Sequence, residues 1–493
     1  MNAIVEVFSI VQAMSKSEKR YFKMVSELQK GEKSYLTLFT ILEKHTMPDD
    51  DLANEVRKSF PGQTVEPARK HLYRVLMKSL RQFDTEKDVE TRLSNLLQDS
   101  RLLYNRGLLK LSFDQLEKTK TLALQREKFM YYVLAARQEL QYLVRSHFEG
   151  LDEFELLEKQ KRITELLEQQ TKIEQHSTLY EILLLRYWRN GMVRSQQEAT
   201  RLNDLLLEEY QLLNGPGRKP FELQQLHLHF QSIYFQMTGN PEGSLPVFYD
   251  LDALFQQNHE LWKGAPLYYF HLLDGVLYDL RQMQRYEDMQ FFLQRLQSLH
   301  EEGGGLNVVL TYKTLEHELN VFADRRLFDE GLMHMKTFEE RWQREASQLP
   351  LHMHAQLLFA GARILVGVKD YSAALKLINI ALNQLTSAMS QAQQSMFQIL
   401  NLMVNTLLNN VDYLQYALRA AERKLKSDRK LFGVEQLMLS FLKKWIAARS
   451  FPEFNDQLHA LQQNPFERQL INELALAEWY DRVKPLSSFG AKK

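Results

Sequence analysis

The sequence contains no cysteine. Disulfides, thiolate zinc sites, iron–sulfur clusters and cysteine nucleophiles are therefore all excluded. Glycine (19 residues) and proline (12 residues) are also scarce, whereas an all-β or α/β fold uses both residue types in its many turns. The composition therefore favours long helices that are joined by short loops.

Long apolar runs are missing as well. No stretch of 18 apolar residues occurs, and the start of the chain, from Met1 to Lys16, lacks the basic segment of a secretory signal. The absence of cysteine suits a reducing compartment. We therefore expect a cytoplasmic protein that does not enter a membrane.

The chain also has no excess of charge of either sign. Its 62 basic and 62 acidic residues give a formal net charge of zero, whereas a protein that coats nucleic acid usually carries a basic surplus. Any contact with nucleic acid would have to be local. Residues 1–83 do carry a small surplus, with 14 Lys and Arg against 10 Asp and Glu.

Helical periodicity recurs with a longer period along most of the 493 residues. In the clearest unit Tyr371 opens a helix, Ala374 follows three residues later, and Ile378 and Ala381 continue the apolar face. The corresponding anchor positions are spaced by 41 to 45 residues and lie at Phe113, Phe154, Gln196, Pro241, Tyr286, Phe328, Tyr371, Tyr413 and Phe454.

This pattern resembles the tetratricopeptide repeat, whose second helix begins with an aromatic residue and has a small residue where the two helices cross. The third position after the anchor is small at Ala199, Ser244, Gly331 and Ala374, but not at Leu116, Leu157, Met289, Tyr416 and Gln457. The period also exceeds the usual length of about 34 residues. The resemblance is therefore one of architecture, and HEAT-like or other α-solenoid pairs remain open.

The predicted fold is all-α, a right-handed α-solenoid of about nine helix–turn–helix repeats with a period of about 42 residues. A pair of helices of this length buries its apolar faces only by stacking on its neighbours. We expect three parts: an N-terminal helical head (1–88), the repeat array (89–464), and a C-terminal capping helix and tail (465–493).

The resemblance implies that the first helix of each pair lines a concave groove. Counting back from the anchors gives mostly polar positions, whose side chains can bind peptide backbone or carboxylates. These candidate groove residues are His271, Asp274, Tyr278, Arg281, Lys313, Glu316, Asn320, Gln356, Arg363, Gln398, Asn401 and Asn405. The alternative is an ordinary solvated face, which would look equally polar.

Asn401 and Asn405 form the preferred pair, because Asn is a poor helix former that needs another reason to be present. The sequence thus predicts a non-enzymatic scaffold that binds a protein or peptide partner in its concave groove.

Catalytic and cofactor motifs are not found in the sequence. The pairs His227/His229 and His352/His354 are two residues apart, so a helix turns their side chains to different sides and neither pair can hold one metal ion. No nucleophile elbow, phosphate loop, kinase signature or dinucleotide fingerprint occurs. We therefore expect neither an enzyme nor a bound cofactor or metal.

The head offers a second function. A helix is expected from about Pro67 to Phe83, after a turn at residues 60–64, and one side of it carries a basic stripe of Lys70, Arg74, Lys78 and Arg81. A basic second helix after a turn is a DNA-binding layout, and bacterial regulators combine such a head with a sensor domain. The alternative function is therefore a transcriptional regulator; otherwise the stripe is a solvated helix face.

Overall fold

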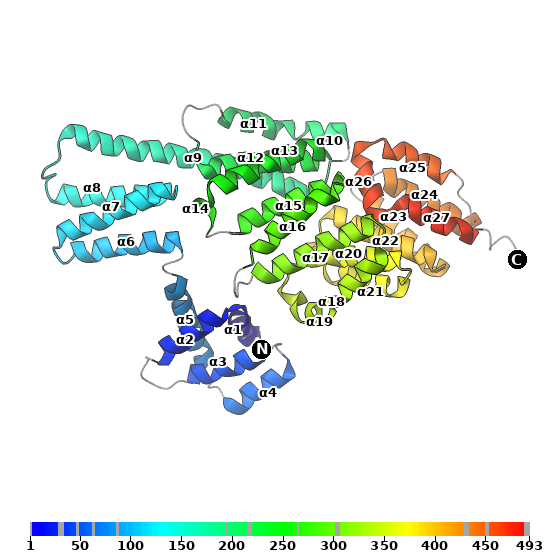
Figure 1. The fold of residues 1–493 in the computed structure, drawn as a ribbon, viewed down its shortest axis with the longest axis horizontal. Helices are drawn as coiled ribbons and strands as arrows, with labels where there is room; N and C mark the ends of the chain where they lie inside the picture. Colours follow the sequence, from blue (N-terminus) through cyan, green and yellow to red (C-terminus); the bar gives the residue numbers. More distant parts are fainter. Residues whose placement is uncertain are drawn as a thin grey trace.

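The computed structural model describes residues 2–27, 34–45, 49–61, 65–84, 88–193, 195–213, 219–263, 266–300, 306–426, 433–448 and 453–487. All regular structure in these ranges is helical, so the predicted all-α class is confirmed (Figure 1). Among the helices of these ranges, none is both long enough and apolar enough to cross a membrane.

The first five helices form a group with its own core (blue in Figure 1). They are α1 (Asn2–Ala13), α2 (Lys16–Glu27), α3 (Ser34–Lys44), α4 (Asp50–Ser59) and α5 (Val65–Asp84). Phe22, Phe39 and Leu72 are fully buried at the centre of this group. Of the predicted turn between α4 and α5, residues 62–64 lie outside the described ranges.

The remaining helices are α6 (Val89–Tyr104), α7 (Leu109–Gln125), α8 (Phe129–Arg145), α9 (Glu153–Asn190), α10 (Gln196–Thr200), α11 (Asn203–Leu213), α12 (Phe221–Met237), α13 (Pro241–Gln257), α14 (His259–Trp262), α15 (Pro266–Gln282), α16 (Tyr286–Ser298), α17 (Leu306–Asp324), α18 (Phe328–Thr337), α19 (Glu339–Glu345), α20 (Leu351–Gly367), α21 (Tyr371–Gln384), α22 (Gln391–Leu407), α23 (Val411–Lys426), α24 (Gly433–Ala448), α25 (Phe454–Gln462), α26 (Pro465–Leu474) and α27 (Leu476–Ser487). Most of them pack on their neighbours in the chain, whereas α11 and α12 pack on α9 (Figure 1).

Most of the anchors found in the sequence begin a helix. Six of them are the first residue of a helix, namely Gln196, Pro241, Tyr286, Phe328, Tyr371 and Phe454. The predicted repeat requires a turn between the anchors Phe154 and Gln196 that divides this segment into two long helices. That part of the prediction is wrong, because α9 runs without interruption for 38 residues. Residues 151–190 contain no glycine or proline, so nothing stops the helix before Gly191.

Seven of the connecting turns share one backbone conformation. The second residue before the next helix has a positive φ of 52° to 76°, at Gly107, Glu127, Gly239, Gln284, Arg326, Lys369 and Asn409. The amide of the following residue then donates to the carbonyl five residues back, as Asp370 does to Leu365 at 2.9 Å. This pattern satisfies carbonyl groups at the end of one helix and reverses the chain for the next.

Two glycines allow helices to approach closely. A Cβ at Gly367 would lie 2.1 Å from the Phe328 ring, and one at Gly275 would lie 2.3 Å from the Phe248 ring. Each ring therefore packs directly on the backbone of the facing helix, α20 in the first case and α15 in the second.

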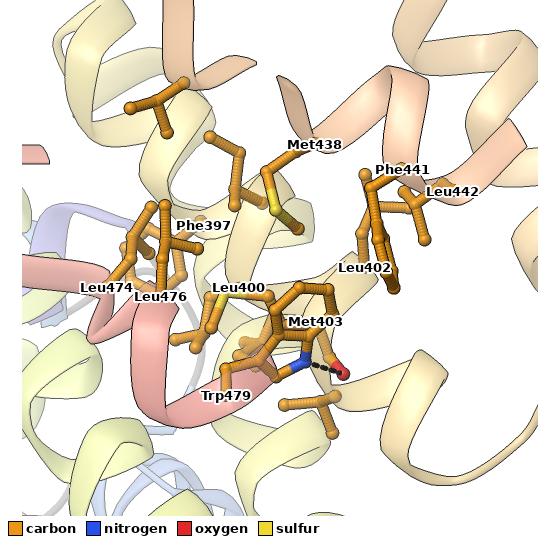
Figure 2. Close-up of a cluster of buried hydrophobic side chains, with 14 of the residues drawn as sticks. Phe397, Leu400, Leu402, Met403, Met438, Phe441, Leu442, Leu474, Leu476 and Trp479 are labelled. Carbon is orange, nitrogen blue, oxygen red and sulfur yellow. Dashed lines mark hydrogen bonds between the residues drawn. The ribbon is translucent and has the colours of Figure 1, made fainter. Parts of the chain in front are cut away.

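Two segments that are far apart in the sequence, α9 and the pair α26 and α27, both contact α22. The helix α9 contacts both α12 and α22, and the Trp188 ring of α9 packs on His352 of α20 at 5.7 Å between ring centres. The C-terminal helices α26 and α27 also contact α22. In Figure 2 the indole nitrogen of Trp479 donates to the carbonyl of Met403 at 3.0 Å, among buried apolar side chains. Both segments thus cover one side of α12 to α22.

Candidate ligand-binding cavity

A partly open cavity of about 420 Å³ lies on the side covered by these two segments. Its walls come from α9, α12, α13, α15, α17, α20 and α22, and Glu473 of α26 closes one part of them. Eight of the twelve candidate groove residues line it, namely His271, Asp274, Tyr278, Arg281, Lys313, Glu316, Asn320 and Gln356.

Helical spacing brings these side chains to one place. On α15, residues 271, 274, 278 and 281 are three or four positions apart, so they share one face of the helix. Residues 313, 316 and 320 have the same spacing on α17. Since α15 and α17 pack against each other, their two polar faces meet at the same cavity.

The other four candidates lie elsewhere. Asn401 and Asn405 are buried and line no part of the cavity. The Asn401 amide donates to the Tyr413 hydroxyl at 2.8 Å, and the Asn405 amide donates to Asn401 at 2.9 Å. The preferred pair from the sequence thus joins α22 to α23, and internal hydrogen bonds explain why Asn is present there.

Arg363 faces a second, smaller cleft of about 190 Å³ on the far side of Arg281. Gln398 is half-buried on α22 and is not among the residues that line either cavity. Neither residue therefore reaches the larger cavity.

Several lining residues were missed by the sequence analysis. Tyr180, Tyr187 and Trp188 come from α9, and His229 and Gln236 come from α12. The groove positions were counted back from the repeat anchors, and α9 does not follow the repeat because it is a single long helix. Glu473 was missed for a different reason, because no local pattern indicates that a residue near the C-terminus meets α15.

One set of charged groups lies at the α15–α17 wall. The Lys313 ammonium lies 3.2 Å from Asp274 and 2.7 Å from Glu316, and it donates to Gln356 at 3.1 Å. His317 lies 2.8 Å from the same Asp274 carboxylate. Burial by itself lowers the pKa of Lys313, but the two carboxylates outweigh it and the net pKa is raised. Lys313 therefore stays protonated and paired.

A second set joins α15, α17, α20 and α26. Arg281 binds the Asp324 carboxylate at 2.6 and 3.0 Å and the Glu473 carboxylate at 2.9 Å through two nitrogens. Arg363 donates to Asp324 at 2.6 Å and to the Asn320 amide oxygen at 3.0 Å. Burial by itself lowers the pKa of Arg281, and the two carboxylates reverse this. The chain's own Glu473 thus occupies the place expected for a partner's carboxylate.

No group of three His, Asp or Glu side chains in the described ranges is placed to hold a metal ion. Comparison of the chain with known proteins finds no matching family model, no similar curated protein and no similar solved structure. The function of the cavity is therefore argued from its own geometry.

Beside the cavity, Asp279 is a buried acid on α15 that is not paired with a cation in the described ranges. Its side chain is fully buried and accepts a hydrogen bond from the Gln236 amide at 3.0 Å. Its second oxygen has no hydrogen-bond partner among the described residues. Burial raises the pKa of Asp279 to about 7, against the opposing effect of Ser244 and Gln236.

This raised pKa predicts a pH-dependent stability. Because the folded chain holds the proton more tightly than the unfolded chain, with its ordinary pKa of 3.8, the stabilisation is fully present below pH 4 and is lost as the pH rises toward 7. At about 1.4 kcal/mol per pKa unit, the free energy of unfolding falls by about 3 kcal/mol between pH 5 and pH 8. Asp279→Asn should remove this fall, as measured by urea unfolding at both pH values.

The control is Asp288→Asn, which removes an exposed carboxylate paired with Arg285 on the protein surface. We expect its stability to follow that of the wild type in parallel. If the free energy of unfolding of Asp279→Asn fell between pH 5 and pH 8 by as much as that of the wild type, Asp279 would not titrate in this pH range.

Proposed function

We propose that the chain is a right-handed α-solenoid of about nine tetratricopeptide-like helix pairs, and that it acts in the cytoplasm as a non-enzymatic scaffold. Its partner is a protein or peptide that places a short segment in the cavity between α9 and α22. The observation that carries the proposal is the convergence of eight polar side chains, from three successive first helices, on one cavity.

The pairing of the charged groups supports binding rather than catalysis. Lys313, Arg281 and His317 each contact a carboxylate of the same chain. The Lys313 amine is therefore not free to act as a nucleophile or general base. Amide side chains such as Gln236, Gln356 and Gln393, which also line the cavity, match the donors and acceptors of a peptide backbone instead.

The size of the cavity limits the segment that it takes. An open solenoid groove holds an extended peptide along several repeats. Here the end of α9 and Glu473 both contribute to the walls, so the proposal is restricted to a short segment or a loop tip rather than a long peptide.

The test is photo-crosslinking in lysate of the native host. The crosslinking residue p-benzoylphenylalanine replaces His271, which is exposed and lines the cavity. We expect one protein to be captured, and a short peptide from it to compete for capture. The control places the same residue at Tyr416, which is 69% exposed and does not line the cavity. Equal capture at both positions, or none at 271, would contradict the proposal.

A second candidate function is DNA binding by the head. Lys70, Arg74 and Lys78 of the basic stripe are exposed on α5. Lys70 lies 3.7 Å from Glu66, whereas the ion pairs of the described residues include no carboxylate beside Arg74 or Lys78. Arg74 instead donates to the His71 ring at 2.8 Å. These two cations are therefore available to phosphate groups.

This candidate predicts a charge-dependent affinity. The double variant Arg74→Glu/Lys78→Glu should bind a fluorescent DNA duplex at least tenfold more weakly, with a slope of affinity against salt reduced by about 2. The matched control is Lys444→Glu. Lys444 lies on α24, outside the head, and its side chain is 54% exposed. Unchanged binding by the double variant would exclude the stripe as a DNA contact.

A further inference from the structure

One histidine in the cavity is buried without a hydrogen bond. His229 of α12 is only 6% exposed, and its ring lies 5.9 Å from the Tyr180 ring of α9. The hydrogen bonds of the described residues include none to either ring nitrogen of His229. Burial and the neighbouring His271 lower the pKa of His229 to about 3. Its ring is therefore neutral, with one nitrogen that donates and one that accepts.

Two tyrosines in the same cavity are in a similar position. Tyr187 of α9 and Tyr278 of α15 both line it. Neither hydroxyl takes part in a hydrogen bond among the described residues, and burial raises the pKa of both, so both hydroxyls stay neutral. A hydroxyl both donates and accepts. These three groups thus offer both kinds of hydrogen bond to the cavity, and Tyr180 and His271 also line it without a side-chain hydrogen bond among the described residues.

The charged groups of the cavity, in contrast, are paired with groups of opposite charge from the same chain. Lys313 is enclosed by Asp274 and Glu316, and Arg281 is enclosed by Asp324 and Glu473. An anionic ligand would have to displace one of these carboxylates. A cationic ligand would have to compete with Lys313 for Asp274 and Glu316 or with Arg281 for Glu473, because each of these carboxylates already contacts a cation of the chain. An ion placed in a buried site without a free counter-charge loses its hydration without compensation.

We infer that the cavity binds an uncharged group that both donates and accepts hydrogen bonds and that carries an apolar or aromatic face. The hydrogen bonds go to His229, Tyr187 and Tyr278, and the apolar face packs on Phe359, Met396 and Phe397, which also line the cavity. An amino-acid residue with its neutral backbone amide and an apolar or aromatic side chain is a group of this kind. It belongs either to a segment of a partner protein or to a free small molecule, and the first source rests on the proposed function.

The test uses three tyrosine derivatives that differ in charge and in one end group, at a pH of about 6. N-acetyl-tyrosinamide is then neutral, N-acetyl-tyrosine is an anion and tyrosinamide, whose α-amino group is protonated, is a cation. Binding of each to the full-length protein is measured by ligand-observed NMR titration. We expect the neutral probe to bind at least tenfold more tightly than either charged probe. Equal or tighter binding of a charged probe, or binding of none of the three, would overturn the inference.

Variants place the neutral probe in the cavity. Tyr278→Phe removes one hydroxyl and should weaken binding of the neutral probe about threefold to tenfold. Tyr187→Phe is a second variant with the same expected effect, should the first fail to fold. The matched control is Tyr416→Phe, at a position 69% exposed and outside the cavity, and it should leave the affinity unchanged. Equal affinity in all three variants would place the probe elsewhere and overturn the inference.

A longer probe separates the two sources of the ligand. N-acetyl-Ala-Tyr-Ala-amide keeps its affinity if the cavity receives a segment of a partner chain. A loss of affinity on extension, with the neutral single-residue probe still bound, supports a free small molecule. In that case the proposed scaffold function fails while the inferred charge class stands. Preference for a charged probe has the opposite meaning, because it overturns the charge class and leaves the scaffold function in place.

Discussion

The buried contact between Arg281 and Glu473 joins the C-terminal helix α26 to α15. These residues are 192 positions apart, and their two parallel hydrogen bonds fix both the distance and the plane of the contact. Asp324 and Arg363 extend it to α17 and α20. A buried ion network of this kind is satisfied in one arrangement only, so it fixes how α26 docks. The apolar side chains of α27, such as Trp479, supply most of the burial there.

The same contact determines the chemistry of the cavity. Without Glu473, Arg281 would face the cavity with Asp324 as its one carboxylate partner among the described residues, and it would suit an anionic partner. With Glu473 in place, Arg281 and Arg363 share two carboxylates, and neutral side chains of the cavity such as His229, Tyr187 and Tyr278 make no side-chain hydrogen bond among the described residues. Glu473 thus makes an uncharged group, rather than a carboxylate, the ligand that we infer for this cavity.

Local features such as helix starts could be predicted from the sequence, but the contact between the C-terminal helix α26 and α15 could not. Tyr371 was correctly placed at a helix start from the repeat pattern, and Asp370 before it caps that helix by accepting from the Ala373 amide. Lys369 in a left-handed turn carries no such signal, since glycine or asparagine is the usual residue there. The polar face of α15 was found by counting back from the anchor at Tyr286. Its partner Glu473 was not, because a contact across so many residues depends on the curvature that the whole chain adopts.

The most direct measurement is amide hydrogen exchange of residues 465–487 in Glu473→Gln and in Glu478→Gln. The second variant is the control, because Glu478 lies on the adjacent helix in a half-exposed pair with Arg326, and such pairs contribute at most about 1 kcal/mol. Breaking a buried pair costs about 3–5 kcal/mol. We therefore predict exchange at least tenfold faster in Glu473→Gln and nearly unchanged in Glu478→Gln. Equal exchange in the two variants would show that the Arg281–Glu473 contact does not hold the C-terminal helices in the groove.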